Sequence, residues 1–204
     1  MKEAVIVAAV RTPLGAFGGS LKDVPAVDLG SLVIKSAIER ANLKPEQVDE
    51  VIMGNVLGAG LGQNVARQMS VNAGIPVASP AFTINKVCGS GLKAVQLAAQ
   101  AVLCGDADIV VAGGAENMSQ APYVLPNQRW GARMGDSQVV DTMLRDGLTD
   151  AFGSFHTAIT AENVAEQYGI KREDQDNFVV KSQKRAVAAL EIGRSQEEHV
   201  PFEI

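Results

Sequence analysis

The segment AFTINKVCGSGLKAVQLAAQAVLCGDADIVVA, residues 81–112, decides the fold of this 204-residue chain. Residues 81–87 have an alternating pattern that includes β-branched side chains, which predicts a strand. Residues 89–103 are apolar or small on nearly every face and predict an interior helix, which Gly105 ends. The apolar run 109–112 predicts a further buried strand. The segment is therefore a β-α-β unit.

The same alternation extends toward the N-terminus. The apolar run 4–10 predicts a strand buried on both faces, and residues 48–57 predict another. Two helices are predicted between the strands, one over residues 65–73 and one capped by Asp28 with a single apolar stripe of Leu29, Leu32, Val33, Ala37 and Ala41. Such alternation implies right-handed crossovers, so we predict an α/β fold with a mostly parallel sheet covered on both faces.

From Ser119 onward the pattern changes to amphipathic helices. We predict helices over residues 137–146, from a cap at Thr160 to Gly169, and over 173–192 before Gly193. The side chains expected to face inward on the second helix are Ala161, Val164, Ala165 and Tyr168. The predicted domains are an α/β core over residues 1–118, a helical region over 119–195 and the start of a returning strand over 196–204.

Composition excludes several classes of protein. Apolar residues make up 47% and charged residues 20%, as in folded globular proteins. A net charge of −5 and 4% aromatic residues argue against nucleic-acid binding. Neither long uncharged stretch, 51–66 or 69–85, resembles a membrane span, and the run 4–10 is too short for a signal peptide. We therefore expect a cytoplasmic protein with reduced thiols, no membrane partner and no metal, since no cluster of metal ligands is evident.

The two cysteines lie in opposite settings. Cys104 follows an apolar helix and sits at its negative dipole end, so we predict a small core residue. Cys88 lies between a strand and a helix N-terminus, where unpaired N–H groups and the positive dipole end favour a thiolate. Gly89 and Gly91 permit a tight turn and a close substrate, and Ser90 can satisfy the first helical turn. Cys88 is either a nucleophile or a structural cysteine on this evidence.

A thiolate nucleophile needs a base, and the chain has two histidines. His199 lies among Glu197 and Glu198 and is interpreted as a surface residue. His156 follows Phe155 and precedes a helix, which fits either a ligand-facing loop or a packed, hydrogen-bonded side chain. The catalytic set is incomplete from spacing alone.

The residues around Cys88 resemble the acyl-enzyme signature of thiolases, specifically acetyl-CoA acetyltransferases. The signature is the run TINKVCGSGLKA over residues 83–94. Further ordered matches are VRTP at 10–13, GQNVARQ at 62–68, AGGAENMS at 112–119, DGLTDAF at 146–152 and TAENVA at 160–165.

The resemblance implies a thiolase fold with a layered α/β/α core, of which this chain would be the N-terminal half. Cys88 would form an acetyl thioester, which condenses with a second acetyl-CoA to give acetoacetyl-CoA and CoA, or reacts in the reverse thiolysis. The helical region would be the loop domain that covers the pantetheine channel, lined by Leu148 and His156. The resemblance also implies a homo-oligomer, with coenzyme A thioesters as substrates and no cofactor.

Two departures from the family pattern matter. Thr157 and Ala158 follow His156 where family members usually carry Met-Gly, so a methionine of the acyl-CoA pocket is absent. The resemblance also implies a protein about twice this length, whose second half supplies Asn-Glu-Ala-Phe, Gly-His-Pro and Cys-x-Gly motifs. These motifs do not occur in residues 1–204, so we expect little turnover from this chain alone. The alternatives are a non-catalytic CoA-binding or assembly module and a related condensing enzyme.

Overall fold

The computed structural model describes residues 3–203 and divides them into two compact units. The sheet unit comprises the residues up to Gly147 together with those from Val200 onward, and the helical unit is Leu148–His199. The domain boundaries at residues 118 and 195 follow the change in sequence pattern, and they stay predictions.

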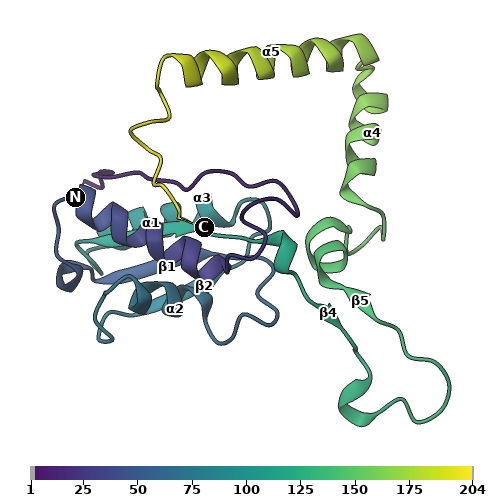
Figure 1. Cartoon of the computed structure of the whole chain (residues 1–204), viewed down its shortest axis with the longest axis horizontal. Helices are drawn as coiled ribbons and strands as arrows, with labels where there is room; N and C mark the ends of the chain where they lie inside the picture. Colours follow the sequence, from purple (N-terminus) through teal and green to yellow (C-terminus); the bar gives the residue numbers. More distant parts are fainter. Residues whose placement is uncertain (1–2, 204) are drawn as a thin grey trace. The chain divides into compact units, whose positions relative to one another are not determined.

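The sheet unit is built around three parallel strands, β1 (Glu50–Gly54), β2 (Ala81–Ile84) and β3 (Val110–Gly114), in the order β2-β1-β3 (Figure 1). Val51 lies opposite Ala81 on one side and Val111 on the other. Helix α1 (Ala26–Arg40) precedes the sheet, α2 (Val65–Asn72) joins β1 to β2, and α3 (Ser90–Cys104) joins β2 to β3. The predicted α/β class with a parallel sheet is confirmed.

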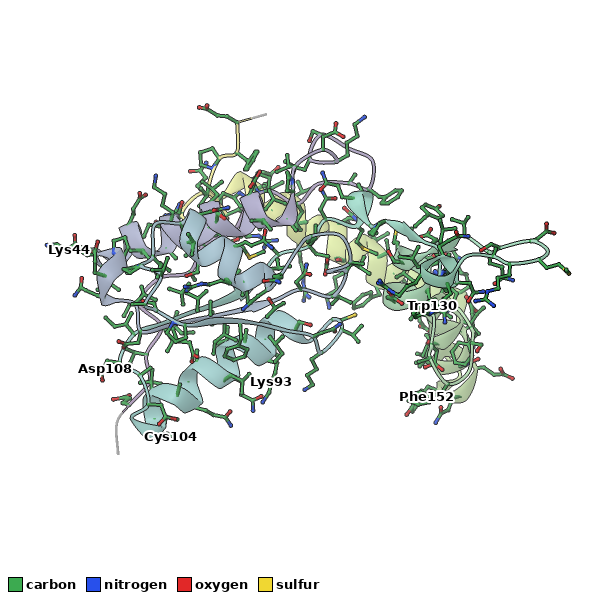
Figure 2. All side chains as sticks on the ribbon, turned by 90° about the horizontal axis from the view of Figure 1, so that it is seen from below. Lys44, Lys93, Cys104, Asp108, Trp130 and Phe152 are labelled. Carbon is green, nitrogen blue, oxygen red and sulfur yellow. The ribbon has the colours of Figure 1, made fainter. Side chains whose placement is uncertain are left out.

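The helices cover both faces of this sheet. The chain moves from β1 to β2 and then returns across β1 to reach β3, so right-handed connections place α2 and α3 on opposite faces. Figure 2 shows the helix that carries Lys93 and Cys104 on one side of the strands and α1 on the other. Successive residues of β1 follow the same division: Val51 and Met53 pack in the core with α1 and α2, and Ile52 packs against α3.

Helix α1 begins at Ala26, two residues before the predicted cap at Asp28, and of the predicted apolar stripe only Leu29 is buried. Leu29, Ile34 and Ile38 are buried, whereas Leu32 and Val33 are only partly buried. Close contact with α2 determines which face of α1 is buried. A Cβ on Gly30 of α1 would lie 2.3 Å from the sulfur of Met69 in α2.

Helix α3 begins and ends one residue later than predicted, and it is not interior on every face. Its buried residues are Ser90, Ala94 and Ala98, which face the sheet, while Leu92 is 78% exposed. Cys104 is exposed as well, so its predicted place in the core is wrong; it lies beyond Ala98, the last buried residue of the helix. Among the described residues, Val87–Cys104 is the one segment long and apolar enough to cross a membrane by length and composition. One face of this segment, with Ala94 and Ala98, packs against Ile52 of the sheet.

The predicted N-terminal strand is wrong. Residues 4–10 are extended but belong to neither sheet, and Val5, Ile6 and Val7 are 68–78% exposed. A strand needs a neighbouring strand for its backbone groups, and residues 4–10 pair with none of β1, β2 and β3. The segment meets the end of the described chain where the Val200 N–H donates to the Arg11 carbonyl (2.8 Å). The returning strand over residues 196–204 stays a prediction.

The later part of the sheet unit contains a small antiparallel pair, β4 (Tyr123–Val124) and β5 (Val140–Asp141). A helix predicted over residues 137–146 is therefore wrong. The buried Thr142 hydroxyl donates to the Pro122 carbonyl (2.6 Å) and holds this stretch beside β4. The helical turn begins only where the Asp141 carboxylate accepts the Met143 N–H (2.8 Å).

The helical unit contains α4 (Thr157–Tyr168) and α5 (Arg172–Glu191). Gly169 ends α4 with a φ of +63°, as predicted, although the helix starts three residues before the expected cap at Thr160. None of the four side chains predicted to face inward is buried, and Tyr168 is 70% exposed. The remaining short helices of the chain are η1 (Pro45–Gln47), η2 (Met118–Gln120), η3 (Gln128–Trp130) and the π-helical turn η4 (Met143–Leu148).

Candidate active site

The carboxyl ends of β1 and β2 mark the position where a ligand is expected. The chain leaves β1 toward α2 on one face of the sheet and leaves β2 toward α3 on the other. Neighbouring strand ends whose connections diverge in this way leave a crevice in parallel α/β sheets. Cys88 lies in the connection between β2 and α3, and it is exposed.

Side chains on both sides of Cys88 hold this turn. The Asn85 side-chain oxygen accepts the Val87 N–H (2.9 Å). The Ser90 hydroxyl accepts the Lys86 N–H (2.8 Å) and donates to the Val87 carbonyl (2.6 Å). Ser90 is 5% exposed, so its two contacts are partly shielded from water, whereas the Asn85 contact is exposed. The Ser90 hydroxyl thus holds the turn before α3 and not, as the sequence suggested, the first helical turn, because α3 has no side-chain cap.

Val87 has a φ of +48°, in the left-handed region. A β-branched residue rarely adopts this conformation, and such outliers cluster at functional sites. The strained residue directly precedes the candidate nucleophile. Sequence reasoning did not find this feature.

The first turn of α3 also lies very close to the end of β1. A Cβ added to Gly54 would lie 2.7 Å from the Ser90 Cβ and 2.9 Å from the Gly91 nitrogen. Only glycine allows this approach, which fixes the helix N-terminus against the carboxyl edge of the sheet. Cys88 therefore precedes a helix start whose position is set by backbone contact, and unpaired N–H groups at such a start favour an anion.

A second polar network lies beside this edge of the sheet, at Glu116. Its carboxylate accepts the Val56 N–H (2.8 Å), the Leu57 N–H (3.2 Å) and the Asn55 side-chain amide (3.0 Å). The same amide donates to the Ala115 carbonyl (3.0 Å), and Asn55 is 4% exposed. Glu116 thus holds the loop that follows β1. Sequence reasoning missed it, although an acidic residue just after a buried strand was the available signal.

The other matched motifs have structural partners too. Asn117 donates to three carbonyls of the loop before α1, those of Leu21, Lys22 and Val24 (2.7–3.2 Å). Asn64 caps α2 by accepting the Arg67 N–H (3.2 Å), and it donates to the Ala81 carbonyl (2.8 Å). These residues attach loops to the sheet.

Leu148 and His156 belong to one small loop of the helical unit. An isolated bridge joins Thr149 to His156, and the Asp150 N–H donates to the Phe155 carbonyl (2.9 Å). Leu148 is partly buried, and His156 is exposed. His156 is the N-cap of α4, because its Nδ1 accepts the Ala158 N–H (3.0 Å). This cap leaves Nε2 as the ring nitrogen available to a ligand.

The sheet unit contains Cys88 but no histidine, since the two histidines of the chain are His156 and His199 of the helical unit. Among residues 3–203, no group of three or more His, Cys, Asp or Glu side chains could hold a metal ion.

These features define a class: an α/β protein with an exposed cysteine at a strand–turn–helix junction, where nucleophiles of this architecture lie. The profile described as "Thiolase, N-terminal domain" matches residues 4–204. The chain belongs to the thiolase family, and its fold is that of the N-terminal domain.

Curated relatives agree with this assignment. The chain is 62% identical over 201 residues to an acetyl-CoA acetyltransferase of Cupriavidus necator, covering 98% of this chain and 51% of the relative. It is 56% identical over 204 residues to an acetyl-CoA acetyltransferase of Pseudomonas aeruginosa, covering 100% and 52%. It is 58% identical over 205 residues to one of Syntrophomonas wolfei, covering 100% and 52%. The chain spans about half the length of these relatives.

Proposed function

We propose that this chain carries the acyl-accepting cysteine of an acetyl-CoA C-acetyltransferase. The observation that carries the proposal is the exposed Cys88, which directly follows the left-handed Val87 at the carboxyl edge of a parallel sheet. Relatives at 56–62% identity are named acetyl-CoA acetyltransferase, which supports acetyl-CoA as the substrate.

In the proposed first half-reaction the Cys88 thiolate attacks the thioester carbonyl of acetyl-CoA. The carbon–sulfur bond to coenzyme A breaks, and CoA leaves as a thiolate that takes up a proton. In the second half-reaction a second acetyl-CoA loses a proton from its methyl carbon, and the resulting enolate attacks the acetylated cysteine. Acetoacetyl-CoA forms and the Cys88 thiolate is regenerated. The reverse sequence is thiolysis.

A base must remove the proton from the second acetyl-CoA, and the sheet unit offers no histidine for this step. We therefore propose that residues 1–204 tested alone accept an acetyl group but turn over poorly. Leu148 and His156 are proposed to line the pantetheine channel; their shared loop and the available Nε2 of His156 support this role. Homo-oligomer formation, a place in lipid metabolism and a cytoplasmic location are part of the same proposal.

Exchange of label between acetyl-CoA and free CoA tests the proposal, because exchange requires the first half-reaction alone. We expect the chain to catalyse this exchange. Cys88→Ser should abolish it, and Cys104→Ser, a matched substitution at the other end of α3, should leave it unchanged.

A non-catalytic CoA-binding or assembly module is the second candidate, because α3 exposes apolar residues such as Leu92. Such a module would bind CoA or associate without exchanging the label. Equal exchange by Cys88→Ser and the parent chain would also contradict the proposed role of Cys88.

A further inference from the structure

We propose that Ser90 is a positioning residue for Cys88. Its hydroxyl, together with the Asn85 side chain, holds Val87 in the left-handed conformation, and this conformation sets the place of the thiol before α3. The chemical role of the thiol rests on the proposed function. The positioning of the thiol by Ser90 and Asn85 rests on the geometry of the turn.

The backbone at Val87 requires such support. A left-handed conformation is unfavourable for any residue with a Cβ and most unfavourable for a β-branched one, so the surrounding structure must impose it. Three side-chain hydrogen bonds hold the backbone from Lys86 to Val87. The Asn85 side chain accepts the Val87 N–H, and the Ser90 hydroxyl accepts the Lys86 N–H and donates to the Val87 carbonyl. The backbone groups on both sides of the Val87 Cα are therefore fixed.

Ser90 is suited to this role because its position is itself fixed. It is buried in the first turn of α3, and its Cβ lies 2.7 Å from where a Gly54 Cβ would be. The hydroxyl acts as acceptor and donor at once, which alanine cannot replace. Without the hydroxyl, the Lys86 N–H loses its hydrogen bond to Ser90. The Val87 carbonyl keeps only its hydrogen bond from the Ser90 N–H (3.1 Å).

The consequence for the neighbouring cysteine follows from chain geometry. If Val87 relaxes to a negative φ, the peptide that enters Cys88 rotates and the thiol leaves its place before the first turn of α3. The thiol would then no longer lie in front of the N–H groups of that turn, and its rate of reaction would fall. Ser90 would thereby act on reactivity without touching the substrate.

Alkylation by iodoacetamide tests this without requiring acyl transfer. Peptide mass spectrometry gives separate rates for Cys88 and Cys104, which are both free and exposed on the same helix or beside it. We expect Ser90→Ala to lower the Cys88 rate about tenfold, because two hydrogen bonds that hold the turn are lost, and to leave the Cys104 rate unchanged. Ser31→Ala is the matched control, because that hydroxyl donates to the Val27 carbonyl (2.6 Å) in α1.

A rescue separates positioning from general stability. Glycine adopts a positive φ without strain, so Val87→Gly combined with Ser90→Ala should recover most of the lost Cys88 rate. If Ser90→Ala fails to fold, Asn85 gives a second test from an exposed position. Asn85→Ala should lower the Cys88 rate, and Asn85→Asp, which retains an acceptor oxygen, should preserve it.

The proposal is overturned if Ser90→Ala alkylates Cys88 at the parent rate, if Val87→Gly gives no recovery, or if the Cys88 and Cys104 rates change together. For the Asn85 pair, equal rates in both variants would overturn it. A parent chain that alkylates normally but exchanges no acetyl label contradicts the proposed function alone, and the Ser90 comparison still decides the positioning role.

Discussion

Glu116 illustrates how one side chain can organise the edge of the sheet where Cys88 is found. Its two oxygens accept three hydrogen bonds from the loop that follows β1, and two of the donors are backbone N–H groups. Backbone donors cannot turn away when their acceptor is lost, so removal of the carboxylate leaves them without a partner. The residue therefore determines the shape of this loop.

Glu116→Gln should destabilise the chain by about 1–3 kcal/mol, because the new amide group presents N–H atoms toward N–H donors. Urea denaturation should show a lower midpoint with an unchanged slope. Glu46→Gln, an exposed change in η1, is the control and should leave the midpoint within error. A Glu116 variant as stable as its parent would mean that the network contributes nothing.

The site could be predicted from sequence only in part. Cys88 was predicted because a strand, a glycine-flanked cysteine and a helix follow one another directly. The conformation of Val87 was not, since β-branched residues normally favour extended backbone. The partners of Ser90 were hidden as well, because hydrogen bonds within a turn depend on backbone angles that residue spacing does not specify.

At the scale of elements, the contact between β1 and α3 depends on a missing side chain. A Cβ on Gly54 would overlap Ser90 and Gly91 backbone, whereas a Cβ on Gly113 in β3 would meet only the Met53 side chain at 3.6 Å. Position 54 therefore has no room for a side chain, whereas position 113 has room for a Cβ.

Gly54→Ala should lower the free energy of unfolding by about 1–3 kcal/mol through overpacking, and it should shift the start of α3. Gly113→Ala should change it by less than about 1 kcal/mol, because ordinary contact and reduced flexibility of the unfolded chain offset each other. Denaturation curves of the two variants make the comparison. Equal losses would contradict the close approach of α3.

His156 stabilises the start of α4, because its side chain caps the N-terminus of that helix. His156→Ala should destabilise the first turn of α4 by about 0.5–2 kcal/mol, while His156→Asn should retain the cap. Hydrogen exchange of the amides in residues 158–160 would show faster exchange in the alanine variant alone. If both variants bind CoA more weakly than the parent, the ring itself contributes to binding, as proposed; unchanged binding in His156→Asn would contradict that part.

Elements with dense local signals were predicted well. β1, α2, α3 and β3 follow apolar periodicity and glycine or proline stops, which act within a few residues. The failures depend on distant partners. Residues 4–10 have the apolar pattern of a strand but no neighbouring strand, and residues 137–146 form β5 because β4 lies beside them. Periodicity predicts that a face will be covered, and it does not identify the covering element.

For the whole molecule, the most informative property is the apolar surface of the sheet unit. Leu92 on α3 is 78% exposed, and Val5, Ile6 and Val7 near the N-terminus are 68–78% exposed. Val5, Ile6 and Val7 are consecutive in the sequence, and exposed apolar patches mark interaction surfaces or promote aggregation.

The chain should therefore self-associate in a concentration-dependent manner. Leu92→Lys should reduce association and leave the unfolding midpoint unchanged, because the leucine side chain contributes little to the core. Sedimentation velocity over a range of concentrations would measure both variants. A strictly monomeric parent chain would show that these residues do not form an associating surface.

The central claim is that Cys88 is the acyl acceptor, and the location of the acetyl group tests it most directly. The chain is incubated with acetyl-CoA, quenched in acid and analysed by peptide mass spectrometry. We predict an acetyl group on the peptide that contains Cys88, absent from Cys88→Ser and retained in Cys104→Ser. Acetylation confined to Cys104 or lysines, or equal labelling of Cys88→Ser, would contradict the account.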